Sequence, residues 1–259
     1  MLTLLAAIAS AVAAASLWQL RRVAGRLEDL ELRLRRSTTE LETLENAFTR
    51  FAPHEIVERI IADGIATEAE TKDITILFAD LKDFTPMAEE LEPSQLMVVL
   101  NGYFESMGQA IAANRGYLSK FIGDGLLALF GALEPNPWHT NDALHAALAM
   151  RAALTAYNER LREQGLPTLA MGMGIHRGPV VAGVLGTSSV KEYGVLGRNV
   201  NVASRVEDLT RVHGTDILVT EAVRIRCDPR FQLREMPPAE AKGIAEPVVT
   251  YCLTGFDPA

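Results

Sequence analysis

Two aspartates occupy positions where a strand end or a hairpin tip would present a carboxylate. Asp80 directly follows the short apolar run 74–79, which predicts a buried strand. Asp124 lies between Gly123 and Gly125, a pattern that indicates a hairpin turn and lets a ligand approach the backbone closely. Two carboxylates at strand ends could share a pair of hard divalent cations, which are the usual means of holding a polyphosphate. Each aspartate alone is more simply interpreted as a turn residue, because Asp favours turns.

A second set of polar residues could bind a nucleotide. Asn201 and Arg205 are four residues apart in the predicted helix 199–210 and therefore share one face. An amide and a guanidinium on that face could hold a ribose and the phosphorus on which charge develops. Lys120 precedes Asp124 by four residues on the strand that enters the hairpin, where a lysine could equally protect a sheet edge. Taken alone, these residues are also consistent with a solvated surface.

Four segments, in order along the chain, resemble the motifs of class III adenylate and guanylate cyclases. Residues 78–85 (FADLKDFT) resemble the first metal-binding motif, and residues 120–125 (KFIGDG) resemble the second. Residues 192–205 (EYGVLGRNVNVASR) are similar to the third motif, and residues 174–183 (GIHRGPVVAG) are similar to the glycine-rich strand pair. The resemblance covers about residues 50–255 with suitable spacing.

The resemblance implies a site for two Mg²⁺ or Mn²⁺ ions. Asp80 and Asp124 would bind both ions, assisted by the carbonyl oxygen of Leu81. In such a site one ion lowers the pKa of the ribose 3′-hydroxyl, and the other holds the triphosphate while pyrophosphate leaves.

The resemblance also assigns the residues that bind ATP. Lys120 would recognise the adenine ring, Asn201 would orient the ribose, and Arg205 would neutralise the charge that grows at the α-phosphorus. Lys242 would contact the terminal phosphates. In this family the metal pair and the Lys/Asn/Arg set of one site come from different chains. The resemblance therefore implies a homodimer with composite sites and an inactive monomer.

Gly194 departs from the family pattern. Many adenylate cyclases carry Asp or Thr at this position, where the side chain helps to read the adenine amino group, and glycine has no side chain for this task. Guanylate cyclases usually carry Glu and Cys at the positions of Lys120 and Gly194, and neither is present. The expected reaction is therefore the conversion of ATP to 3′,5′-cyclic AMP and pyrophosphate. Purine selection would rest on Lys120, on backbone groups or on a residue that the sequence does not identify.

Two alternatives to an adenylate cyclase stay open at this point. The first is a guanylate cyclase, which depends on Lys120 and Gly194. The second is a non-catalytic scaffold that binds nucleotide or only dimerises. The scaffold is disfavoured because both metal carboxylates and the Asn/Arg pair are present.

The elements that must position these residues lie in the predicted catalytic domain, residues 72–255. Their order, β-α-β-β-α-β followed by further elements, predicts an α+β fold with an antiparallel, ferredoxin-like sheet and helices on one face. The predicted strands are 74–79, 117–121, 126–130, 168–175, 180–185, 217–220 and 248–253. The predicted helices are 94–113, 141–163 and 199–210.

The N-terminal segment 1–20 contains no charged side chain and is long enough to span a bilayer as a helix. Arg21, Arg22 and Arg26 follow it, so the positive-inside tendency places the rest of the chain in the cytoplasm. We expect a single-pass anchor in the cell (inner) membrane. A cleaved signal peptide and a buried soluble helix are the alternatives; against the first, no basic residue precedes the apolar run.

A heptad pattern over residues 21–48 predicts a parallel, two-stranded coiled coil. Its apolar positions are Val23, Leu27, Leu30, Leu34, Leu41, Leu44 and Phe48. Ser37 interrupts this seam, which motivates the hypothesis that an unidentified membrane regulator changes the register of the coiled coil. Residues 49–71 are expected to form a connecting, signal-transducing segment. The alternative to the coiled coil is a lone amphipathic helix packed on the following domain.

The net charge limits the classes of binding partner, and the cysteine content indicates the redox compartment. The formal net charge of −8 argues against a nucleic-acid surface. Cys227 and Cys252 lack metal-ligand spacing and are expected to be small buried residues in a reducing compartment. His176, among glycines on a predicted strand, is expected to be structural and not a general base.

Overall fold

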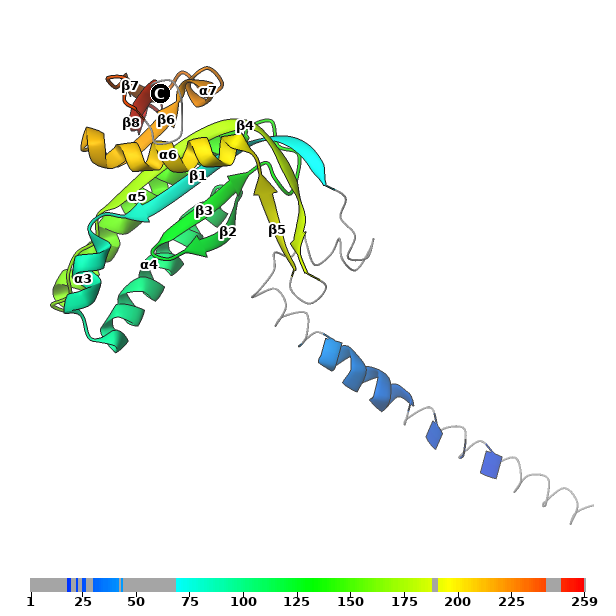
Figure 1. Cartoon of the computed structure of the whole chain (residues 1–259). Coiled ribbons are helices and arrows are strands. Elements are labelled where there is room, and N and C mark those ends of the chain that lie inside the picture. The colour runs from blue at the N-terminus through cyan, green and yellow to red at the C-terminus, as the bar shows by residue number, and fades with distance from the viewer. Residues whose placement is uncertain are drawn as a thin grey trace, which may run out of the picture. The chain divides into compact units, whose positions relative to one another are not determined.

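The computed structural model describes residues 18, 19, 22, 25, 26, 30–41, 43, 69–187, 191–240 and 248–258. The chain divides into two compact units, Met1–Val57 and Glu58–Ala259. In the first unit residues 30–41 are helical (Figure 1), and three seam leucines on this helix are exposed: Leu30 by 63%, Leu34 by 69% and Leu41 by 66%.

The predicted anchor, residues 1–20, lies outside the described residues except for Trp18 and Gln19. Among the residues that are described, no helix has the length and apolar character needed to cross a membrane. The connecting segment 49–71 also lies outside them, except for residues 69–71, of which the last two already belong to the first strand of the second unit.

The second unit is an α+β domain, as predicted. Its strands are β1 Glu70–Leu81, β2 Gly116–Ile122, β3 Gly125–Phe130, β4 Met171–Gly186, β5 Lys191–Leu196, β6 Ile217–Thr220, β7 Phe231–Glu235 and β8 Thr250–Phe256. Its helices are α3 Phe84–Glu90, α4 Pro93–Ala113, α5 His139–Glu163, α6 Arg198–His213 and α7 Glu221–Arg224. Of these, α3, β5, α7 and β7 were not predicted.

The first four strands form the predicted ferredoxin-like core. They lie in the order β2-β3-β1-β4, and each neighbouring pair is antiparallel. Beyond β4 the order continues with β6, β8 and β7, and β5 pairs with β4 outside this path. Strand β6 runs parallel to β4, so the expectation of a wholly antiparallel sheet was wrong. Parallel neighbours need a long crossover, which β5 and α6 supply here.

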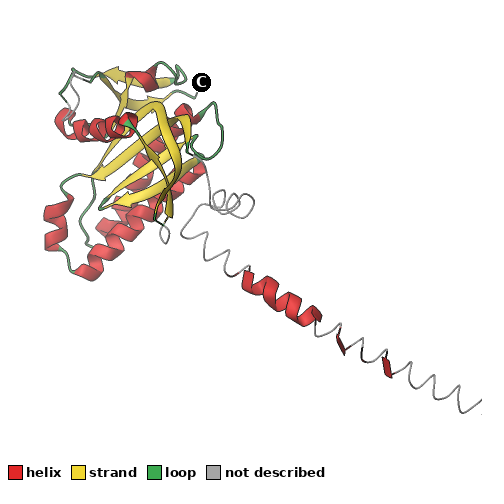
Figure 2. Ribbon diagram, turned by 45° about the vertical axis from the view of Figure 1, so that its right-hand side comes forward, coloured by secondary structure: helices red, strands yellow, loops and turns green. Residues whose placement is uncertain are grey.

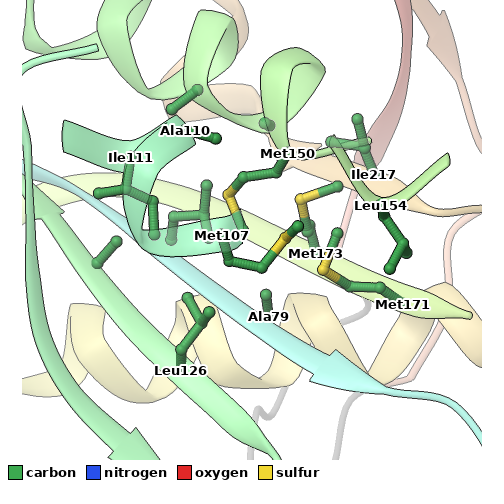
Figure 3. Packing of buried hydrophobic residues seen from close by; sticks show 14 of the residues in the cluster. Ala79, Met107, Ala110, Ile111, Leu126, Met150, Leu154, Met171, Met173 and Ile217 are labelled. Carbon is green, nitrogen blue, oxygen red and sulfur yellow. The ribbon is translucent and has the colours of Figure 1, made fainter. Parts of the chain in front are cut away.

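Helices cover both faces of the sheet, so the prediction that they lie on one face was also wrong (Figures 1 and 2). Helices α4 and α5 pack on the larger core, where Met107 and Met150 meet Met171 and Met173 of β4 above Ala79 (Figure 3). Helix α6 packs on the other face, in a separate cluster that contains Val206, Leu209, Leu218 and Cys252.

The alternation of side chains along β4 explains why α6 can pack so closely. Met171, Met173 and Ile175 are buried in the larger core, and the intervening Gly172 and Gly174 point to the opposite face. A Cβ atom on Gly174 would lie 2.1 Å from the backbone nitrogen of Glu207 and 2.6 Å from the carbonyl oxygen of Ala203. The two glycines therefore set the distance between the sheet and the helix that carries Asn201 and Arg205.

Strand β4 is continuous where two strands, 168–175 and 180–185, were predicted. It pairs with β1 without interruption from Met171↔Leu81 to Ala182↔Glu70, through Gly178 and Pro179. Gly and Pro normally interrupt helices and strands. A proline is tolerated in a strand where its missing N–H would face away from the hydrogen bonds to the neighbouring strand. The long β1 partner thus overrides the local turn signal.

Replacing Gly174 with alanine is expected to lower the free energy of unfolding by about 3 kcal/mol, because backbone atoms of α6 cannot move aside as a flexible side chain could. Chemical denaturation measures the change. Gly108→Ala is the control: on α4 a Cβ atom at that position meets only Leu118 Cδ2 at 3.6 Å, so this change should be neutral or stabilising. Equal destabilisation by the two variants would contradict the close packing of α6.

Candidate active site

The fold brings Asp80 and Asp124 together, as the sequence predicted. Asp80 is the penultimate residue of β1, and Ala79 pairs with Leu126 on β3, only two residues after Asp124. Gly123 has a φ of 63°, which the tight turn before Asp124 requires. A Cβ atom on Gly125 would lie 2.9 Å from Asp80 Oδ1, so only glycine leaves room for the Asp80 carboxylate.

The negative charge of Asp80 affects the pKa of Asp124. The pKa of Asp124 is raised, first by partial burial and then by the negative charge of Asp80. The backbone N–H groups of Asp124 and Leu81 and the positive charge of Arg211 oppose this rise. A cation placed between the two carboxylates would oppose the effect of the Asp80 charge on Asp124.

Arg211, at the C-terminal end of α6, binds the same oxygens that the resemblance assigns to metals. Its Nη2 donates to Asp80 Oδ2 at 2.9 Å and to the carbonyl oxygen of Leu81 at 3.0 Å. Positive charge is therefore already stabilised between these oxygens by a group of the chain itself.

The donor set fits hard divalent cations. The described residues contain no group of three or more acidic, histidine or cysteine side chains that could hold a metal. The oxygens of Asp80, Asp124 and Leu81 would accordingly have to be completed by a nucleotide's phosphates or by water, which is how Mg²⁺ is usually bound.

Glu207 is a buried acid next to this site that the sequence analysis missed. Its carboxylate accepts a hydrogen bond from Arg211 Nη1 at 3.2 Å, and its side chain is 7% exposed. Burial raises the pKa of Glu207 to about 7; the charge of Asp80 adds to the rise, and the charge of Arg211 opposes it. The signal available in the sequence was the i, i+4 spacing of Glu207 and Arg211.

This raised pKa makes stability depend on pH. The folded-state pKa of Glu207 lies above its ordinary value of 4.5, so the folded state binds its proton more tightly than the unfolded state does. The contribution of Glu207 to stability is therefore fully present below pH 4.5 and is lost as the pH rises to about 7. Glu207→Gln removes this titration and should gain roughly 3 kcal/mol over the wild type across that interval. Denaturation with a metal chelator present, at several pH values, measures the gain; a constant difference would contradict it.

Lys120 contacts strand β5, the strand that carries Gly194. Lys120 Nζ forms an ion pair with Glu192 Oε1 at 2.7 Å, which links β2 to β5. Gly194 is buried in the same strand as Glu192, two residues further along. Sequence analysis did not identify Glu192, although its alternation with Gly194 on a strand was a usable signal.

Asn201 and Arg205 lie on α6, as predicted. Asn201 is exposed, and Arg205 Nη1 forms an ion pair with Asp208 Oδ2 at 2.9 Å. Within the part of the chain that the structure describes, no hydrogen bond or ion pair joins these two residues to Asp80 or Asp124. Lys242 lies outside the described residues.

His176 is held at both ring nitrogens. Nδ1 is 2.8 Å from Thr220 Oγ1, and Nε2 is 3.1 Å from Asn199 Oδ1. Burial lowers the pKa of His176, which favours the neutral ring. These contacts tie β4 to β6 and to the first turn of α6, in line with the structural role expected for it.

The comparisons with known proteins agree on one family. The family model described as the adenylate and guanylate cyclase catalytic domain matches residues 66–255. An adenylate cyclase of Anabaena cylindrica is 37% identical over 236 residues, which cover 87% of this chain and 46% of that protein. The chain therefore spans about half the length of this curated relative.

Two solved structures also share the fold of the second unit. The guanylyl cyclase Cya2 is 33% identical, with a TM-score of 0.68, covering 74% of this chain and 96% of that chain. The adenylyl cyclase CyaB from P. aeruginosa is 27% identical, with a TM-score of 0.69, covering 74% and 98%. This chain belongs to the family of adenylate and guanylate cyclase catalytic domains.

Proposed function

We propose that this protein is an adenylate cyclase that converts ATP to 3′,5′-cyclic AMP and pyrophosphate. The observation that carries the proposal is the oxygen cluster of Asp80, Leu81 and Asp124. Arg211 donates to Asp80 and to the Leu81 carbonyl oxygen, and its positive charge opposes the rise in the pKa of Asp124. The similarity to the Anabaena cylindrica adenylate cyclase supports the choice of ATP.

The residues of the chain have separate tasks in this reaction. Two Mg²⁺ or Mn²⁺ ions, held by Asp80, Asp124 and the Leu81 carbonyl, would activate the ribose 3′-hydroxyl and neutralise the phosphates. Asn201 orients the ribose so that the 3′-oxygen faces the α-phosphorus. Arg205 donates hydrogen bonds to the oxygens that gain charge as pyrophosphate leaves, and Lys242 binds the terminal phosphates. Lys120 binds the adenine edge.

We propose that each active site is shared between two chains of a homodimer. Among the described residues of one chain, no hydrogen bond or ion pair joins the carboxylate pair to Asn201 or Arg205. A two-fold dimer brings one chain's pair opposite the partner's and forms two equivalent sites. On this proposal Lys120 and Asp124, four residues apart, serve opposite sites.

The test is cyclic nucleotide formation by the purified full-length chain, given ATP or GTP with Mg²⁺ or Mn²⁺. We expect cyclic AMP from ATP as the main product, dependent on metal. A folded dimer that makes no cyclic nucleotide under any of these conditions would favour a nucleotide-binding scaffold.

A guanylate cyclase is the second candidate, and a specific observation favours it: Gly194 offers no side chain to read the purine, and Cya2, a guanylyl cyclase, is 33% identical. Cyclic GMP as the main product in the same assay would establish it. Lys120 argues against it, because a lysine donates a hydrogen bond and the N1 position of guanine is itself a donor.

Residues 1–48 are proposed to anchor and pair the chains at the cell membrane, with the catalytic domain in the cytoplasm. Exposed leucines at positions 30, 34 and 41 form one stripe, which a parallel coiled coil would bury. The coiled coil then keeps two catalytic domains at a high local concentration, and a membrane regulator could act on its register.

Replacing Ser37 with leucine should complete the apolar seam and lock one register. We expect a dimer more resistant to thermal dissociation, with basal cyclase activity altered at least about twofold in either direction. Circular dichroism melts and an activity assay measure both. Unchanged values for both would speak against a register-dependent coiled coil.

A further inference from the structure

Strand β5 carries an acidic side chain at the place where Gly194 leaves the purine without a partner. We propose that Glu192 selects adenine by accepting a hydrogen bond from its 6-amino group, beside Lys120. This inference rests on the proposed function and names the residue that takes over the task of the missing side chain.

The pleat of β5 directs Glu192 and Gly194 to the same side. Tyr193, between them, is buried, and its hydroxyl donates to the carbonyl oxygen of Ala132 at 2.9 Å. Because side chains alternate along a strand, positions 192 and 194 share the face opposite Tyr193. The Glu192 side chain is 56% exposed on that face and is therefore accessible to a ligand.

The carboxylate of Glu192 lies next to the place where a side chain at position 194 would begin. A Cβ atom built on Gly194 would be 3.9 Å from Glu192 Oε1, an ordinary van der Waals contact, and 3.3 Å from Leu185 Cδ1. Glu192 therefore presents its carboxylate beside the position from which an Asp or Thr side chain would extend.

Lys120 and Glu192 together present a donor next to an acceptor. Lys120 Nζ is 2.7 Å from Glu192 Oε1, while Oε2 makes no hydrogen bond with the residues that the structure describes. Adenine offers the matching pair, the N1 acceptor and the 6-amino donor. Guanine carries an oxygen at the 6-position, which a carboxylate repels. With Lys120 at N1, the acidic Glu192 at the 6-position favours adenine.

The test compares ATP with two analogues, one that lacks the 6-amino group and one in which N1 is replaced by carbon. In the wild type each deletion should lower kcat/KM by about 10- to 100-fold, the usual effect of losing a hydrogen bond to a charged group. In Glu192→Ala, loss of the 6-amino group should have no further effect, while loss of N1 should still lower kcat/KM through Lys120.

Two further variants make the test specific. Glu192→Gln keeps the size and can donate to the 6-oxygen of guanine, so the preference for ATP over GTP should fall about tenfold. Glu192→Ala combined with Gly194→Thr places a hydroxyl near the vacated position, and the effect of the 6-amino group should return. Thermal unfolding should be unchanged in the two single variants, because both side chains of the pair are partly exposed.

The outcomes separate this inference from the proposed function. If the wild type makes no cyclic AMP, the proposed function fails and this inference fails with it. If the wild type is active but Glu192→Ala keeps the 6-amino effect and loses the N1 effect, Glu192 only positions Lys120, and the inference alone is overturned.

Discussion

Cyclic AMP formation should fall by at least about a thousandfold when Asp80 is replaced by asparagine in the full-length chain. The substitution keeps the size of the side chain and removes one of the two charges that hold the metals. Metal binding measured by calorimetry with an ATP analogue that lacks the 3′-hydroxyl, and therefore cannot cyclise, should weaken in parallel. The pKa of Asp124 should also fall, because the charge of Asp80 now raises it; nuclear magnetic resonance of labelled carboxylates measures this without any activity assay.

Asp83→Asn is the matched control for this experiment. Asp83 is an exposed residue three positions away with a φ of 53°, a backbone conformation that asparagine tolerates well. We expect activity within about twofold of the wild type, since exposed substitutions of this kind have little effect. Similar losses in Asp80→Asn and Asp83→Asn would mean that Asp80 has no special role at the metal site.

Mixing two inactive variants should restore activity if the sites are shared between chains. Asp80→Asn and Arg205→Ala should each retain less than about 1% of wild-type activity. When the two chains exchange freely, half of the dimers are mixed, and each mixed dimer has one site with both intact halves. Recovery should therefore reach about a quarter of wild-type activity.

The control is a mixture of Asp80→Asn with Asp124→Asn. Both changes lie in the same half of the site, so each mixed dimer has a defect in both sites and no activity should return. Differently tagged chains confirm that mixed dimers form. Recovery in neither mixture would place all the catalytic groups of a site on one chain. Recovery in both would place Asp80 and Asp124 in different halves of the site and would contradict the shared metal pair.

The order of elements and the pairing of Asp80 with Asp124 were predictable from the sequence, because both depend on local signals. An apolar run followed by an aspartate, and an aspartate between two glycines, each have one strong local interpretation. The chain order β-α-β-β-α-β then leaves few ways to arrange the first four strands, and the predicted ferredoxin-like core was confirmed.

Non-local packing decided what was predicted wrongly. Gly178 and Pro179 indicated a turn, but the twelve residues of β1 pair with β4 without interruption and keep it one continuous strand. The parallel pairing of β4 with β6 joins strands that are far apart in the sequence. The packing of α6 on the second face depends on Gly172 and Gly174 lying under a helix that begins 24 residues after Gly174. No local pattern contains that information.

The sequence by itself therefore determined the family resemblance and the candidates for metal and nucleotide binding, because each is a short motif whose chemistry is carried by neighbouring residues. Only the tertiary structure showed that Arg211 binds Asp80, 131 residues away in the sequence, and that Lys120 binds Glu192, 72 residues away in the sequence. Such contacts depend on how β5 and α6 lie against the first strands, and that placement results from packing of the whole domain.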